Sequence, residues 1–178
     1  KENDYKRSQT SSINRSQPSS LKSHKLFNDF FKTLTAYKLG STLFVNNFDS
    51  FISEVITNGI PNCEFLDIFK DEAQDEETFE TVINFFPWGY RTKDGKRADN
   101  VLAMQAIRLI SDDGIGILYY PSYIFLQNSN LKLKLSNQGF FINSIINLPE
   151  KFNRPNTAVN GILVFISRVN TKYTYFAE

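Results

Sequence analysis

The residues best suited to chemistry lie in the stretch 79–89, where an apolar run enters a turn made of proline, an aromatic residue and glycine. Pro87 and Trp88 form the start of that turn, and Phe85 and Phe86 come directly before it. The indole of Trp88 offers a flat face on which a nucleic acid base can stack, a contact worth about 1–3 kcal/mol per base. The two phenylalanine side chains carry no hydrogen-bond donor or acceptor. The stretch therefore predicts a stacking surface without a polar anchor.

This stretch resembles the catalytic strand and loop of N6-adenine DNA methyltransferases, whose pattern is Asp-x-Ile-x-x-Asn-Pro-Pro-(Phe/Tyr/Trp)-Gly. Glu80 stands at the Asp and Val82 at the Ile, and Pro87-Trp88-Gly89 match. In the family, the Asn carbonyl accepts a hydrogen bond from the amine of a flipped-out adenine and aims it at a methyl group. Phe85 replaces that Asn and offers no acceptor. The resemblance therefore implies a degenerate site with little or no activity. Its catalytic positions are Phe85, Phe86, Pro87 and Trp88.

Hydrophobic patterns downstream predict alternating helices and strands. The expected elements are a helix over 98–111 closed by Asp112-Asp113-Gly114, a buried strand over 115–121, a short helix over 131–137, a strand over 140–147 and a last strand over 158–168. The alternating leucines and lysines of 131–135 also fit a strand.

The series resembles the second half of the methylation subunit of type I restriction-modification systems, which has a strand ending in Leu-Pro-Glu-x-x-Phe and then a strand reading Ile-Leu-Val-Phe. The segment 148–152 (Leu-Pro-Glu-Lys-Phe) keeps the first of these with one residue fewer, and 162–165 (Ile-Leu-Val-Phe) keeps the second. Their order and spacing, more than any single piece, carry the resemblance. It implies as partners the specificity or methylation subunits of such a system, and DNA as a further one.

Upstream, we expect a strand over 42–46, a helix over 50–57 and a strand over 63–67. In the family, the first of these strands ends in an acidic residue that holds the ribose of S-adenosylmethionine, and the position here is Asn47. The second ends in an Asp that contacts the cofactor's adenine, and Asp67 fits it, although an acidic residue at that place also fits an ordinary solvated loop. The resemblance thus implies S-adenosylmethionine as the cofactor of an active form.

The family's first, central strand carries a Gly-rich turn, because the turn takes positive φ and passes close to the ligand. The first glycine here is Gly40; residues 21–39 read as one amphipathic helix, and the polar residues 1–20 are predicted to be a disordered tail. Because residue 1 is not Met, we expect a piece of a longer or processed protein. The predicted fold is a three-layer α/β, Rossmann-like methyltransferase domain over 21–178, with a mostly parallel sheet, an antiparallel C-terminal strand and no first strand. Either the strands that flank the missing one pair directly with each other, or another chain covers the gap.

The composition limits the number of domains and the kinds of partner that the chain can be expected to have. At 178 residues and 41% hydrophobic content, one domain with a core is expected. The net charge of +1 does not demand nucleic acid. The loop after Trp88 nevertheless gathers four basic residues, which the resemblance places near DNA phosphates and which otherwise form a solvated loop. They are Arg91, Lys93, Lys96 and Arg97.

A single cysteine, Cys63, excludes an internal disulfide and fits a reducing cytoplasm. One Cys and one His cannot form a tetrahedral zinc site, so no metal is expected. No apolar run approaches the length of a membrane span.

Three hypotheses follow. The first is a degenerate adenine methyltransferase-like domain of the type I kind, inactive alone, that acts as a structural or partner-binding subunit. The second is an active DNA adenine methyltransferase completed by a missing segment or a partner chain. The third is a nucleic-acid-binding module that uses Trp88 and the basic loop without catalysis.

Overall fold

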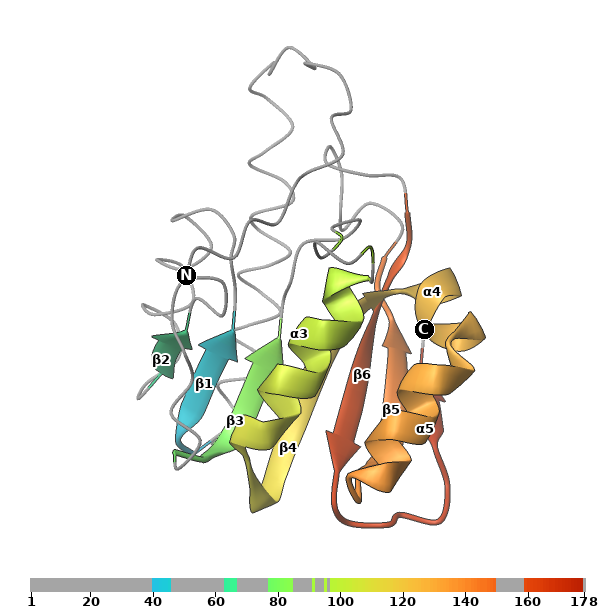
Figure 1. The fold of residues 1–178 in the computed structure, drawn as a ribbon. Helices are drawn as coiled ribbons and strands as arrows, with labels where there is room; N and C mark the ends of the chain where they lie inside the picture. The colour runs from blue at the N-terminus through green and yellow to red at the C-terminus, as the bar shows by residue number, and fades with distance from the viewer. Residues whose placement is uncertain are drawn as a thin grey trace.

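The computed structural model describes residues 40–45, 63–66, 77–84, 91, 95, 97–149 and 159–177. Within these ranges, seven strands form one sheet, accompanied by three α-helices and one 3-10 turn (Figure 1). The strands are β1 (Thr42–Val45), β2 (Cys63–Leu66), β3 (Phe79–Asn84), β4 (Ile110–Pro121), β5 (Phe141–Asn147), β6 (Gly161–Ser167) and β7 (Tyr175–Ala177). The helices are α3 (Ala98–Ala106), α4 (Ser122–Gln127) and α5 (Ser129–Asn137), and the 3-10 turn is η2 (Ile107–Leu109).

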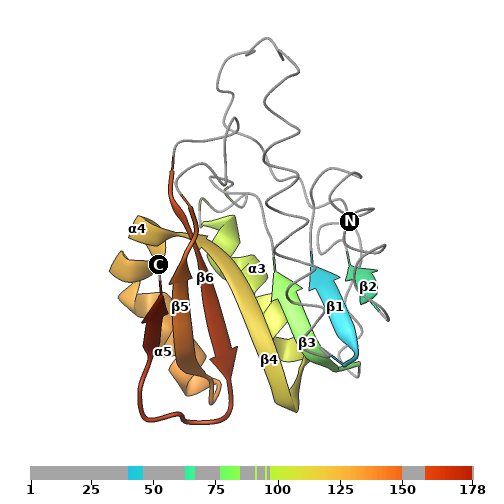
Figure 2. The ribbon, with the colours of Figure 1, turned by 180° about the vertical axis from the view of Figure 1, so that it is seen from behind.

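The strand order is β2-β1-β3-β4-β6-β5-β7. Strands β2, β1, β3 and β4 run parallel to their neighbours, whereas β6 is antiparallel to both β4 and β5. Figure 2 shows β7 beside β5 at the sheet margin, where the two pair in parallel. The predicted α/β fold, mostly parallel with one antiparallel strand, is confirmed. That antiparallel strand is β6, and it is followed by the short β7.

At the position where the family's first strand would lie, β1 pairs directly with β3. Thr42 is in register with Thr81 and Val45 with Asn84. Because the backbone groups on this side of β1 already bond to β3, no strand fits between them. A missing central strand was expected either to let its neighbours pair directly or to leave a gap for another chain. In the described sheet the neighbours pair directly.

A glutamate ties the beginning of β1 to β3. The Glu80 carboxylate accepts a hydrogen bond from the Ser41 N–H at 3.0 Å, and the Glu80 N–H donates to the Ser41 hydroxyl at 3.2 Å. Gly40 precedes this contact with φ +64°, and a Cβ there would collide with the Glu80 carboxylate. Glu80, at the Asp of the family pattern, therefore has a structural role at the amino ends of the strands.

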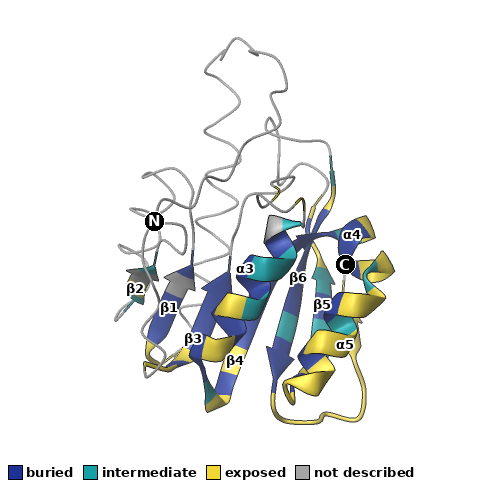
Figure 3. Ribbon diagram, viewed as in Figure 1, coloured by how far each residue is buried: buried dark blue, intermediate teal, exposed yellow. Residues whose placement is uncertain are grey.

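The central strands of the sheet are buried on both faces (Figure 3). One face forms the main apolar cluster with the helices, and its strand residues include Val82, Leu118 and Val164. Ile83, Ile117 and Leu163 alternate with these residues along the strands and are buried as well, at 0–1% exposure. Burial on both faces agrees with the expected three layers. The helix expected over 50–57, the helix over 21–39 and the tail 1–20 lie outside the described residues.

The helix expected over 98–111 is shorter than predicted, because it ends at Ala106, continues as η2, and gives way to β4 at Ile110. Ile110 pairs with Phe79, and the next pair is Thr81 with Ile115. The segment 111–114 therefore bulges out of the ladder, with its two aspartates exposed. The prediction of Asp112-Asp113-Gly114 as a helix end was wrong, since pairing of buried Ile110 with β3 competes with a further helical turn.

Two elements were not predicted, α4 and β7. Helix α4 begins after Pro121, whose φ of −62° suits a helix start, and the Ser122 N–H donates to the Asn160 carbonyl at 3.0 Å. The ambiguous segment 131–137 is helical and lies in α5, whose first turn is capped by the Asn128 side chain accepting from the Leu131 N–H at 3.0 Å. No described helix is long and apolar enough to cross a bilayer.

Candidate functional site

The carboxyl ends of β1 to β4 meet at one edge of the sheet, uppermost in Figure 1. We call it the carboxyl edge. In open parallel α/β sheets, ligands bind outside the carboxyl ends of the strands. The last residue of β1, Val45, is in register with Leu66 of β2 and Asn84 of β3. The three strands that lead to the predicted site therefore end side by side.

Most predicted site residues follow those strand ends in sequence but lie outside the described residues, so their roles stay predictions. They are Asn47 after β1, Asp67 after β2, Phe85, Phe86, Pro87 and Trp88 after β3, and Lys93 and Lys96 in the basic loop.

Asn84, the last residue of β3, was missed by the sequence analysis. Its side chain is fully buried, and its amide nitrogen donates to the Leu102 carbonyl of α3 at 3.3 Å. Its amide oxygen is buried with no hydrogen-bond partner among the described residues. An unpaired buried acceptor costs about 1–3 kcal/mol. An Asn within an apolar strand, directly before Phe85, is the signal that could have drawn attention to it.

Arg97 and Asp99 form an ion pair at the start of α3. The Arg97 Nε lies 3.1 and 3.0 Å from the two Asp99 carboxylate oxygens, and its Nη2 also contacts that carboxylate. Asp99 is only 1% exposed and also accepts from the Asn100 N–H at 2.9 Å. The hydrogen bonds that Arg97 donates to Asp99 raise the pKa of Arg97, against the opposing effect of partial burial. This guanidinium is thus committed within the protein, and a phosphate contact by Arg97 would compete with Asp99.

Arg91 differs from Arg97. Its backbone forms an isolated antiparallel bridge with Arg97, and its Nη1 donates to the Gly95 carbonyl at 2.7 Å. Arg91 is exposed, and the bond to Gly95 is the side-chain hydrogen bond it makes within the described part of the chain. Of the four predicted DNA contacts, Arg91 and Arg97 are described, and only Arg97 is in an ion pair with a described residue; the contact of either with DNA stays a prediction.

Tyr120, near the end of β4, joins this edge to the helices. Its hydroxyl donates to the Asp99 carbonyl at 3.1 Å and lies 3.5 Å from the Asn100 side-chain oxygen. The Asn128 amide donates to that same oxygen at 2.9 Å. Burial raises the pKa of Tyr120 well above its ordinary value, and the Asp99 charge adds to the effect. Tyr120 therefore stays neutral and acts as a donor.

The described part of the carboxyl edge is a scaffold. Its polar side chains hydrogen-bond to other protein groups, and these bonds link the start of α3, the end of β4 and the start of α5. The residues are Arg97, Asp99, Asn100, Tyr120 and Asn128. A network of this kind positions loops and does not supply a free base.

Comparison with known proteins supports this fold. No family model and no curated protein matches the sequence. Among solved structures, a protein from Listeria monocytogenes described as a class I S-adenosylmethionine-dependent methyltransferase aligns over 92% of this chain and 67% of its own, with TM-score 0.62 and 13% identity. The chain has the class I methyltransferase fold.

Two further solved structures belong to type I restriction-modification systems. One comes from a study of the assembly and conformational transition of such a system, with TM-score 0.53, 16% identity, and coverage of 75% of this chain and 32% of that one. The other is described as a modification subunit of a type I restriction enzyme from Vibrio vulnificus, with TM-score 0.53, 13% identity and coverage of 84% and 46%. This methyltransferase-like chain thus spans less than half of each, and at these identities the likeness concerns the fold.

Proposed function

We propose that this methyltransferase-like domain is a degenerate relative of the N6-adenine DNA methyltransferases of type I restriction-modification systems. It is inactive alone and serves as a structural or partner-binding subunit. The observation that carries the proposal is the direct pairing of β1 with β3.

The pairing bears on the cofactor. In the family that the sequence resembles, the central first strand delivers the Gly-rich turn that approaches the methionine moiety. Here its place is taken by a ladder in which β1 and β3 pair at four successive positions. Reopening the ladder would break backbone hydrogen bonds worth about 0.5–1.5 kcal/mol each. Phe85 also stands at the position of the base-holding Asn. The proposal therefore combines a lost cofactor turn with a lost acceptor for the adenine amine.

The partner role draws on the solved structures of type I systems, one of which concerns complex assembly. We infer that the partners are specificity or methylation subunits and that the domain works near DNA. Sedimentation of the purified chain mixed with such subunits tests this role, and a mixture that sediments as separate components contradicts it.

The deciding experiment for activity is calorimetric titration of the purified chain with S-adenosylhomocysteine, which occupies a methyltransferase cofactor pocket without reacting. We expect no heat of binding up to millimolar ligand. An active type I methylation subunit under the same conditions is the positive control. Micromolar binding by this chain would contradict the inactive state and would point to a pocket around Asn47 and Asp67.

One observation favours the second hypothesis, an active methyltransferase completed by a missing segment or a partner chain. The unpaired amide oxygen of Asn84 is an acceptor at the end of β3, one residue before the position of the family's Asn. If that oxygen serves chemistry, the chain mixed with partner subunits will transfer labelled methyl groups from S-adenosylmethionine to DNA, and Asn84→Leu will abolish the transfer. Equal label in wild type and variant would remove this support.

A further inference from the structure

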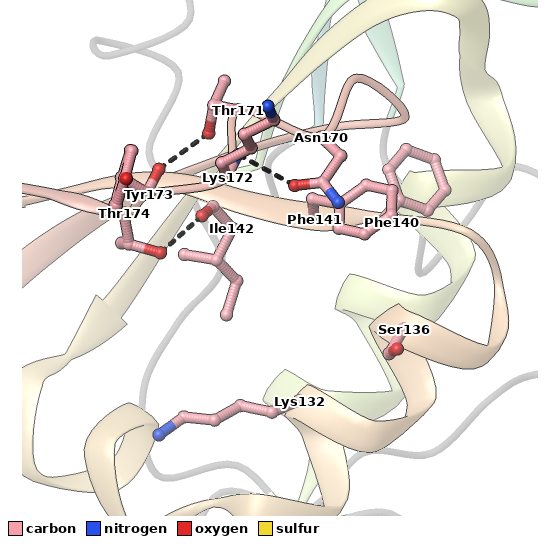
Figure 4. A pocket seen from close by; sticks show the side chains of 10 residues that line it. All are labelled: Lys132, Ser136, Phe140, Phe141, Ile142, Asn170, Thr171, Lys172, Tyr173 and Thr174. Atoms are coloured by element: carbon pink, nitrogen blue, oxygen red, sulfur yellow. Dashed lines mark hydrogen bonds between the residues drawn. The ribbon is translucent and has the colours of Figure 1, made fainter.

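A shallow groove lies at the end of the sheet away from the carboxyl edge. It is bounded by α5, by the start of β5 and by the turn 170–174 before β7, and has a volume of about 290 Å³ (Figure 4). Lys132 lines it from α5, and Phe141 and Tyr173 line it from the sheet side. We call it the α5–β7 groove.

The groove lies in a part of the chain that is almost free of carboxylates. Residues 114–177 contain one acidic residue, Glu150, and six basic ones, which are Lys132, Lys134, Lys151, Arg154, Arg168 and Lys172. The residues that line the groove include two lysines and no acidic residue. Lys132 is held in place by donating to the Leu126 carbonyl at 3.0 Å. Lys172 is exposed and has no carboxylate partner among the described residues. The charge of this surface therefore suits an anionic ligand.

Exposed aromatic rings accompany these cations. Tyr173 is 75% exposed and Phe176 is 72% exposed. Phe176 is in register with Ile145, which is buried in the cluster beneath the helices, so Phe176 lies on the groove side of the sheet. Tyr175, 69% exposed, is in register with Ser144 and lies on the opposite side. Tyr173 thus offers an exposed ring in the groove lining, and Phe176 offers a second exposed ring on the same side of the sheet, outside the lining.

The turn that carries these residues is held rigidly. The Thr174 hydroxyl donates to the Ile142 carbonyl at 2.8 Å, and the Asn143 amide donates to the Val169 carbonyl at 2.9 Å. Lys172 has φ +65°, an unusual conformation for a residue with a Cβ, and its N–H is held by the Asn170 side chain at 2.9 Å. The backbone that carries Lys172 and Tyr173 is therefore held in one conformation, which lowers the entropic cost of ordering the turn on binding.

We propose that the α5–β7 groove binds an unpaired nucleic acid strand, with phosphates near Lys132 and Lys172 and bases stacked on Tyr173 and Phe176. Proteins that bind single strands combine a basic groove with aromatic rings on which bases stack, and both are present here. An acidic peptide would satisfy the lysines but would leave the ring faces without a specific use. The site is separate from the carboxyl edge and does not depend on the proposed function.

The test is fluorescence anisotropy of a labelled oligothymidylate of about 15 nucleotides titrated with the full chain at low salt. Tyr173→Ala is expected to weaken binding by about fivefold or more, because it removes one stacking platform. Lys172→Gln should also weaken binding and lower the slope of log affinity against log salt by about 0.7. Tyr175→Ala is the matched control, since it removes an equally exposed ring from the opposite face and should change nothing. Circular dichroism of each variant confirms folding.

Several results would overturn the proposal. One is the absence of any anisotropy change at the highest protein concentration. Another is equal loss of affinity in Tyr173→Ala and Tyr175→Ala, or displacement of the strand by polyglutamate as readily as by unlabelled oligonucleotide, which would indicate a peptide surface. Sedimentation of a dimer that Phe176→Lys dissociates would assign the face to a second copy. Binding lost in Arg91→Gln and kept in Tyr173→Ala would move the strand to the carboxyl edge and leave the proposed function untouched.

Discussion

The two halves of the sheet meet at β4 and differ in build. On one side, the parallel strands β2, β1 and β3 are 4, 4 and 6 residues long. On the other, β4, β6 and β5 are 12, 7 and 7 residues long, β6 runs antiparallel to both of its neighbours, and α5 lies over β5. The parallel half leads to the residues expected to do chemistry, whereas the antiparallel half contains much of the apolar core and few charges. Among the described residues, the longer strands and the 12-residue β4 thus lie on the antiparallel side, and the parallel side is built of short strands paired directly with one another.

The largest effect should come from the core of the antiparallel half. Phe125 is fully buried, with its ring centroid 5.6 Å from that of Tyr120. Phe125→Ala should lower the free energy of unfolding by about 3–5 kcal/mol through the cavity it leaves. Val45→Ala in β1 should cost about 2 kcal/mol for the smaller apolar group lost. Urea denaturation of both variants measures the difference, and a larger loss at Val45 would contradict this account of the two halves.

The next effect concerns the ion pair at the carboxyl edge. Arg97→Leu would leave the Asp99 carboxylate buried without its partner, which we expect to cost about 3 kcal/mol. Because the Arg97 side chain is 33% exposed, the lower end of the range for buried pairs applies. Arg97→Lys, which keeps the charge but not the planar fork, is the control and should cost less. If Arg97→Leu is as stable as wild type in denaturant, the pair does not hold α3 on the sheet.

A smaller effect should appear at the opposite end of the parallel half. Gly40→Ala forces a residue with a Cβ into a left-handed backbone conformation, which should lower the free energy of unfolding by about 1–2 kcal/mol. The new Cβ would also collide with the Glu80 carboxylate. The double variant Gly40→Ala/Glu80→Ala removes the colliding side chain, so it should regain the stability that the collision costs. A double-mutant cycle from urea denaturation gives the coupling between the two residues. Strict additivity would show that Glu80 does not hold the start of β1.

Tyr120 lies on β4, where the two halves meet, and its ionisation should make the free energy of unfolding depend on pH. The pKa of Tyr120 is raised, so the folded state keeps this phenol protonated after the unfolded chain has released its proton. Stability is therefore complete below the unfolded pKa of about 10 and falls by up to about 1.4 kcal/mol per pH unit above it. Tyr120→Phe removes the effect, so its unfolding free energy should fall less steeply in alkali. Parallel slopes for wild type and variant, measured by denaturation across that range, would contradict this.

The smallest expected change is at the end of β3. Asn84→Leu removes a buried amide whose oxygen has no partner among the described residues, so we expect stability to change by about 1 kcal/mol or less. Thermal denaturation at neutral pH is sufficient to detect it. A loss above about 2 kcal/mol would mean that the amide oxygen meets a donor in the folded protein.

The sequence predicted the strands of both halves where an apolar run is long and local, but in the antiparallel half it missed α4 and β7 and placed a helix end inside β4. The 3.6-residue spacing that buries Leu131 and Leu135, together with the Asn128 cap, explains why 131–137 is a helix despite its alternating pattern. The three residues of β7 were missed because a short exposed strand exists only through its pairing with β5. Composition likewise could not show that Asp99 is buried or that Asn84 meets α3, since both depend on tertiary packing.

The pairing of β1 with β3 has a consequence for the width of the molecule at its carboxyl edge. Neighbouring strands lie about 4.8 Å apart, and strands that flank a third lie about twice that distance apart. Val45 and Asn84, which are partners across β1 and β3, are separated by one strand interval. The loops that follow these two strands thus start about 4.8 Å closer together than in a sheet with the central strand. A ring-shaped ligand held between them would meet a narrower site before any side chain is considered.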